Sequence, residues 1–160
     1  SLMVYLWRTS RPHVAIVGRV PGTEHYRNIN RHKVETEPNI LAMRPDENLY
    51  FANAVFLEEH ILKEVSEHPE IDHVLLICNA ISFIDTSALE SLESLITDLQ
   101  EVGVQIHLAE VKGPVMDRLK RSNLLEDLTP GQIFLSTHGA FETLRALSDT
   151  DKQSGPEYMI

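Results

Sequence analysis

Apolar and polar positions along the chain form two kinds of pattern, one typical of strands and the other typical of helices. Short continuous apolar runs predict buried strands, and apolar residues spaced three and four apart predict helices with one buried face. The clearest run, 74–78, predicts a central strand covered on both faces. The predicted strands are 13–20, 40–43, 73–80, 104–111 and 133–135, and the predicted helices are 48–66, 88–102, 113–125 and 141–147.

This order of elements predicts an α/β fold. From residue 40 onward strands alternate with helices, which favours a mostly parallel sheet covered by helices. No helix separates the first two strands, so we expect a mixed, mostly parallel sheet of four to five strands with about four helices. The polar segment 23–38 is expected to be a long connection or an irregular extension.

Composition removes several classes of function. The chain has 160 residues, enough for one domain, and its net charge of −10 repels nucleic-acid phosphates and anionic lipid, so we expect no nucleic-acid partner. No apolar run approaches the roughly 20 residues that span a bilayer. The single cysteine, Cys78, has no partner for an intramolecular disulfide.

Candidate chemistry is sparse. None of the eight histidines is four residues from another, so no zinc-binding helix is expected, and Cys78 in a buried strand behaves as a small hydrophobe. The chain has no phosphate-binding loop, no dinucleotide fingerprint and no recognisable pair of nucleophile and base. We therefore expect no metal, no cofactor and no catalytic residue, which means a protein that is not an enzyme.

The first residues suggest proximity to a membrane. Leu2–Trp7 is apolar and ends in tryptophan, and Arg8, Arg11 and Pro12 follow. This order is typical of a helix that leaves a bilayer on the cytoplasmic side. A hydrophobic edge strand or a remnant of a tag is the alternative interpretation.

The segment Asp85-Thr86-Ser87 lies between a predicted strand and a predicted helix. Its side-chain oxygens can accept hydrogen bonds from the free N–H groups of the first helical turn, and Ser87 with Glu90 has the capping-box spacing. The alternative is functional, because an exposed hydroxyl at a helix N-terminus can carry a phosphate or lie beside a bound anion.

Residues 83–89, Phe-Ile-Asp-Thr-Ser-Ala-Leu, resemble the signature of STAS domains, which are named for sulfate transporters and anti-sigma factor antagonists. In the antagonists the matching loop carries a regulatory phosphoserine, at the position of Ser87 here. Ala88 stands where those antagonists usually have glycine, so the resemblance does not extend to recognition by a dedicated kinase.

Two further segments resemble the transporter branch. Residues 18–23, with Tyr26 and Asn28, are similar to the stretch after the last membrane helix of SulP-type anion transporters, and residues 49–54 resemble a motif at their first STAS helix. The resemblance runs from about residue 8 to residue 148. We therefore expect a membrane-exit linker or artificial chain end at 1–12, a STAS domain at 13–148 and a flexible tail at 149–160.

The resemblance implies a cytoplasmic domain, on the inner face of the membrane, that regulates or assembles a transporter of sulfate, bicarbonate or a related anion. The anion would bind elsewhere, and the partners would be the transporter's own membrane domain, a cytoplasmic regulatory protein or a second copy. Some STAS domains bind nucleotides, which would concern only 85–87. The alternative is a free anti-sigma factor antagonist that is switched by phosphorylation of Ser87.

Two structural expectations follow. Asp85, Thr86 and Ser87 should form an exposed loop at a helix N-terminus, where an anion or a partner could bind. Tyr50 and Phe51 should pack near the sheet while Asn53 makes local hydrogen bonds. The alternative for Tyr50, Phe51 and Asn53 is a contact with the transporter body.

Overall fold

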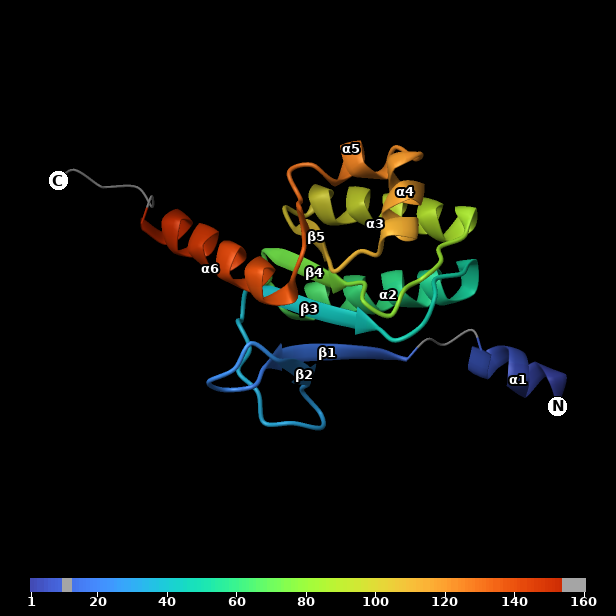
Figure 1. The fold of residues 1–160 in the computed structure, drawn as a ribbon, viewed down its shortest axis with the longest axis horizontal. Helices are drawn as coiled ribbons and strands as arrows, with labels where there is room; N and C mark the ends of the chain where they lie inside the picture. The colour runs from blue at the N-terminus through green and yellow to red at the C-terminus, as the bar shows by residue number, and fades with distance from the viewer. Residues whose placement is uncertain (10–12, 154–160) are drawn as a thin grey trace.

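The computed structural model describes residues 1–9 and 13–153, and its centre is a six-stranded mixed sheet (Figure 1). The strand order is β2-β1-β3-β4-β5-β6, with β3 to β6 parallel and β1 antiparallel to both of its neighbours. The predicted α/β class with a mixed, mostly parallel sheet is confirmed. The strands are β1 (Val14–Arg19), β2 (Tyr26–Asn28), β3 (Ile40–Pro45), β4 (His73–Ile77), β5 (Gln105–Ala109) and β6 (Ile133–Phe134).

Helices cover the two faces of the sheet unequally (Figure 1). Helices α2 and α3, with α4 and α5 beside them, pack on one face, and α6 alone packs on the other. No helix within 1–9 and 13–153 is long and apolar enough to cross a membrane. The helices are α1 (Leu2–Thr9), α2 (Phe51–Glu67), α3 (Thr86–Glu101), α4 (Gly113–Lys120), α5 (Leu124–Leu128) and α6 (Thr137–Gln153).

Side chains alternate along each strand, so neighbouring residues serve different cores. In β4, Leu76 joins the large core beneath α2 to α5, whereas Leu75 joins a smaller core beneath α6. We call these two sides of the sheet the four-helix face and the α6 face. All five residues of β4 are buried, which confirms the prediction of a central strand covered on both sides.

The sheet has one strand more than the four to five predicted from the sequence. The additional strand is β2, at the edge, within the segment expected to be irregular. Gly18 in β1 permits close contact here, because a Cβ atom would lie 2.6 Å from the carbonyl oxygen of Glu35. The backbone groups of Arg19 and Glu35 exchange hydrogen bonds of 2.8 and 2.7 Å, which hold this polar segment against the sheet.

Two helix predictions also needed correction. The segment predicted as one helix over 113–125 forms α4 and α5, because Ser122 interrupts it by donating to the Leu119 carbonyl and accepting from the Leu124 N–H. The closing helix α6 is longer than the predicted 141–147 and continues into the expected tail. Residues 154–160 of that tail lie outside the described residues.

Candidate functional site

The segment Asp85-Thr86-Ser87 begins helix α3 and does not form a separate loop. Asp85 is the N-cap, and its Oδ1 accepts a hydrogen bond of 2.7 Å from the Ala88 N–H. The cap is therefore Asp85, and the Ser87–Glu90 pair lies within the helix. Thr86 and Ser87 are exposed, as expected, while Asp85 is half-buried.

Two cations from α4 and its N-cap border this helix start. Arg118 Nη2 donates to Thr86 Oγ1 at 3.0 Å, and its guanidinium lies 5.5 Å from the centre of the Phe83 ring. Lys112 Nζ donates to Ser82 Oγ at 3.0 Å. An added negative charge on Thr86 or Ser87 would meet both the positive end of α3 and these cations. Sequence reasoning missed Arg118 and Lys112, because only the fold brings α4 beside the start of α3.

The turn before α2 joins this helix start to the rest of the domain. Asn48 Oδ1 accepts hydrogen bonds from the backbone N–H groups of Ser82 and Phe83, at 2.7 and 3.1 Å. Leu49 adds two backbone bonds of 3.1 Å, one to the Phe83 carbonyl and one from the Asp85 N–H. The N-termini of α2 and α3 are consequently held together as one rigid unit.

Tyr50 and Phe51 are exposed, 50% and 59% respectively, so the expectation that they pack near the sheet is wrong. The inward positions at the start of α2 belong to Leu49 and Asn53, and this register turns the two aromatic rings outward. Asn53 makes the expected local bonds, accepting from the Tyr50 N–H and donating to the Asn48 carbonyl, both at 2.7 Å.

The exposed aromatic residues gather at one end of the molecule. The rings of Tyr50 and Phe83 are 6.0 Å apart, and Phe51 and Phe83 are also exposed. Together with Thr86 and Ser87 they form a surface that we call the aromatic end: Tyr50, Phe51, Phe83, Thr86 and Ser87. Exposed aromatic rings that lie near one another are typical of a contact surface.

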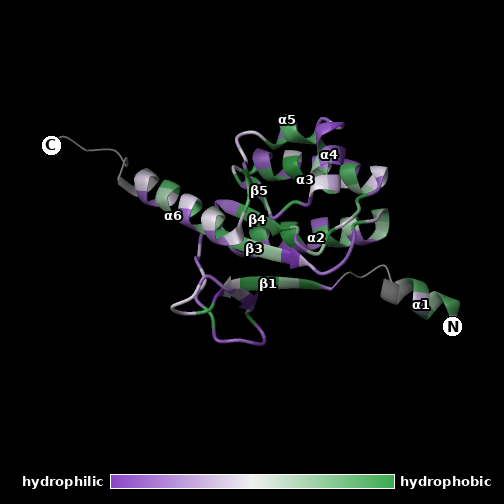
Figure 2. Cartoon of the chain, viewed as in Figure 1, coloured by the Kyte–Doolittle hydropathy of each residue, from purple (hydrophilic) through white to green (hydrophobic). Residues whose placement is uncertain are grey.

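The N-terminal part of the chain reaches the body of the domain at this same end. The His13 N–H donates to Glu47 Oε1 at 3.0 Å, and the His13 carbonyl accepts from the Asp46 N–H at 2.9 Å. Helix α1 is largely hydrophobic (Figure 2), and its side chains from Leu2 to Leu6 are exposed. Arg11 and Pro12 lie outside the described residues, as does the side chain of Arg8.

Reactive groups elsewhere in the domain are shielded. Cys78 is buried, and its burial, with a smaller contribution from the nearby Glu110 carboxylate, raises the pKa of its thiol to about 12. Such a thiol is not a nucleophile at neutral pH. In the part of the chain that the structure describes, no three His, Cys, Asp or Glu side chains are grouped as metal ligands.

Comparison with known proteins gives a consistent result. The sequence profile of the STAS domain matches residues 31–140. High affinity sulfate transporter 2 of Stylosanthes hamata is 36% identical over 153 residues, which cover 89% of this chain and 23% of the transporter. Sulfate transporter 1.3 of Arabidopsis thaliana is 32% identical over 153 residues, which again cover 89% of this chain and 23% of the transporter. The chain thus spans about a quarter of the length of the curated relatives that it matches.

Solved structures match the fold. The murine anion transporter Solute Carrier 26 family member A9 superposes with a TM-score of 0.79 at 20% identity, over 91% of this chain and 24% of the transporter. A putative anti-sigma factor antagonist of Thermotoga maritima superposes with a TM-score of 0.60 at 17% identity, over 69% of this chain and 92% of the antagonist. At these identities the two likenesses concern the fold alone.

Proposed function

Because the chain belongs to the STAS domain family, we propose that it is the cytoplasmic STAS domain of a SulP-type transporter of sulfate or a related anion. Its role is regulation and assembly, and the transport path lies in the membrane part of the protein. The support for this proposal is twofold. Two curated relatives, at 36% and 32% identity, are sulfate transporters, and the domain receives an apolar helix at the end where its aromatic rings are exposed.

That arrangement at the aromatic end is the observation that carries the proposal. The side chains of Leu2 to Leu6 in helix α1 are each more than half exposed. Covering such apolar side chains with lipid or protein is energetically favourable. His13 bonds to Asp46 and Glu47, three to four residues before Tyr50, so the chain arrives beside the exposed rings. The aromatic end therefore faces the membrane part of the transporter.

We propose that Tyr50, Phe51 and Phe83 contact that membrane part. Aromatic residues combine a large apolar area with few rotatable bonds, which makes them effective anchors at interfaces. The bonds of Asn48, Leu49 and Asn53 fix the backbone beneath these rings, so little conformational entropy is lost on docking. Movement of the transporter could then be passed directly to α2 and α3.

The test uses the full-length transporter with Tyr50 and Phe51 both changed to alanine. The expected result is a several-fold loss of sulfate uptake or of transporter in the membrane, while the isolated 160-residue chain keeps its unfolding free energy. The matched control is Val102→Ala, an exposed apolar residue at the C-terminal end of α3. Normal uptake and normal amounts of the double variant would refute docking through the aromatic end.

A second role, a phosphorylation switch at Ser87, is favoured by the Arg118–Thr86 hydrogen bond. A phosphate on Ser87 would bring nearly two negative charges to the positive start of α3, beside a guanidinium already in place. This would change the surface that the membrane part or a cytoplasmic regulatory protein contacts. Ser87→Asp should alter uptake by the full-length transporter, and Ser87→Ala should abolish any effect of a kinase; unchanged uptake in both would exclude the switch.

A further inference from the structure

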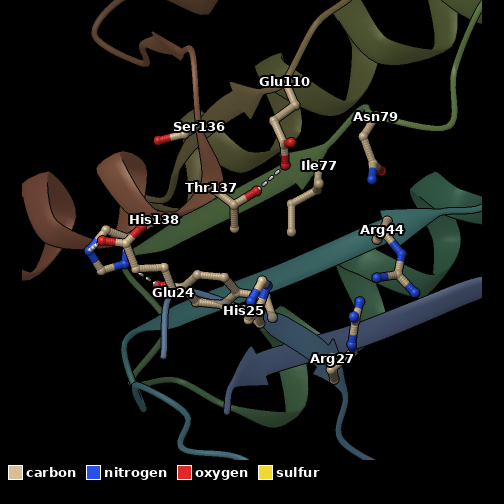
Figure 3. Close-up of a pocket in the computed structure, with 11 residues that line it drawn as sticks. Glu24, His25, Arg27, Arg44, Ile77, Asn79, Glu110, Ser136, Thr137 and His138 are labelled. Atoms are coloured by element: carbon tan, nitrogen blue, oxygen red, sulfur yellow. Dashed lines mark hydrogen bonds and ion pairs between the residues drawn. The ribbon is translucent and has the colours of Figure 1, made fainter. Parts of the chain in front are cut away.

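The α6 face contains a cavity of about 330 Å³ that the proposed function does not use (Figure 3). It lies where β4, β5 and β6 end, because Asn79, Glu110 and Ser136 follow those strands and line it. Ligands of open α/β sheets commonly bind outside the carboxyl ends of parallel strands. Helix α6 begins at the cavity, so this part of the sheet face is left uncovered.

One side of the cavity is cationic. Arg27 and Arg44 direct their guanidinium groups toward one another above the sheet (Figure 3). Arg44 uses Nε to bond Asp46 at 2.9 Å, which fixes its position and leaves its terminal nitrogens for another acceptor. Among the described residues Arg27 has no ion-pair partner. Two guanidinium groups in this arrangement can hold one carboxylate through paired N–H bonds.

The other side of the cavity is acidic. The Glu110 carboxylate accepts a hydrogen bond of 2.5 Å from the hydroxyl of the buried Thr137, at the start of α6. Glu110 has a φ of 56°, a backbone conformation that disfavours a residue with a side chain, and its carboxylate is directed into the site. At the exposed rim, Glu24 Oε1 lies 3.7 Å from His138 Nε2. Thr137 donates to Oε2 of Glu110, and no donor in the described part of the chain bonds its Oε1, so this side can accept hydrogen bonds from a cation.

We infer that this cavity binds a small zwitterion, a free α-amino acid or a close analogue. Its carboxylate would lie against Arg27 and Arg44, and its ammonium group would donate to Glu110 and to the side-chain oxygen of Asn79. A simple anion would satisfy the arginines but would face the Glu110 carboxylate across a small cavity. A simple cation would meet the two arginines. Only a ligand with both charges complements both sides.

The test titrates the 160-residue chain with each of the common free L-amino acids and follows backbone amide resonances by NMR. At least one amino acid should shift the resonances of Asn79, Glu110 and Thr137 in a saturable manner. Its N-acetyl derivative and its carboxamide should each bind at least tenfold more weakly. This site does not depend on the transport role, because binding to the isolated chain is measured without the membrane part.

Variants assign the two sides of the cavity. Arg27→Gln and Glu110→Gln should each weaken binding at least tenfold, while Lys120→Gln at the end of α4 should leave it unchanged. Glu110→Gly removes the carboxylate and relieves the backbone conformation, so a folded Glu110→Gly protein that does not bind separates the loss of charge from unfolding. The inference is overturned if no amino acid binds, or if the N-acetyl derivative binds as well as its parent, which would indicate an anion site.

Discussion

The two faces of the sheet are built from the same strands but carry different side chains. The four-helix face is lined by aliphatic residues and closed by α2 to α5. The α6 face has a smaller apolar core, and beside it lie the buried pair His73 and His107 and the charged cavity around Glu110. Because the four-helix face contains the larger apolar core, it should supply more of the hydrophobic stabilisation, which leaves the α6 face free to hold polar groups.

The strongest test of this difference uses adjacent residues of β4. Leu76→Ala opens a hole in the four-helix face and should cost roughly 3–5 kcal/mol of unfolding free energy. Leu75→Ala should cost roughly 2–3 kcal/mol, because the smaller core beneath α6 can relax toward the neighbouring cavity. Both leucines are fully buried at 0% exposure, so they form a matched pair in urea unfolding. Equal losses would show that the two faces contribute alike.

The histidine pair makes the α6 face sensitive to pH. His107 Nε2 is 3.1 Å from His73 Nδ1, and His107 Nδ1 accepts from the Gln132 N–H at 3.0 Å. Burial, and secondarily the adjacent His73, lower the pKa of His107 from 6.5 to about 4. Below pH 6.5 the unfolded chain therefore binds a proton that the folded chain does not, and stability is lost progressively down to about pH 4.

The expected loss between pH 7.5 and pH 5 is about 2 kcal/mol from His107 alone. It is measured as the difference in urea unfolding free energy at the two pH values. His107→Gln should reduce this difference by about that amount, whereas His32→Gln, at an exposed position, should leave it unchanged. An equal pH dependence in the His107 variant and the wild type would assign the acid sensitivity to other groups.

The side-chain hydrogen bonds at the starts of α2 and α6 should also differ in their contribution to stability. Asn53→Ala leaves the Tyr50 N–H and the Asn48 carbonyl without their partner and should cost about 1–2 kcal/mol. Ser136→Ala at the start of α6 removes the bond from the Gly139 N–H in an exposed setting and should cost about 0.5–1 kcal/mol. Thermal unfolding of both variants compares the two losses of stability. A larger loss for Ser136→Ala than for Asn53→Ala would contradict this prediction.

The smallest effect on stability is expected at the aromatic end. Phe51→Ala should change the unfolding free energy by less than about 0.5 kcal/mol, because the ring is mostly exposed and removes little apolar area from water. Urea unfolding measures this change in free energy. The contrasting variant is Leu57→Ala, at a buried position of α2. A loss above about 1 kcal/mol would mean that Phe51 belongs to the core, and would weaken its assignment to docking.

The central elements could be predicted because burial leaves a local pattern in the sequence. Continuous apolar residues identified β4, and regular spacing identified α2 and α3, whose apolar faces are buried beneath the sheet. Gly103 follows the end of α3, and its φ of 78° is the conformation that favours glycine there. Strand β2 left no such pattern, because it is a three-residue edge strand without a buried residue, held by backbone pairing with β1.

The part of the candidate site that has a local sequence pattern could also be predicted. Asp85 could be expected as a cap and Thr86 and Ser87 as exposed, since helix starts have a local signature. The outward direction of Tyr50 and Phe51 depends on the register in which Leu49 enters the core, which spacing alone does not determine. The contact of Arg118 with Thr86 joins residues far apart in the sequence, and so does the cavity lined by Arg44 and Glu110. Only the fold reveals such contacts.

The burial of Cys78 has a practical consequence for experiments on this domain. The chain has one cysteine, and its thiol is inaccessible and protonated at neutral pH. A maleimide dye or spin label will therefore react only with a cysteine introduced on the surface, with no need to replace the native residue. In this chain, labels at Val102 and at Ser87 would report separately on the two ends of α3.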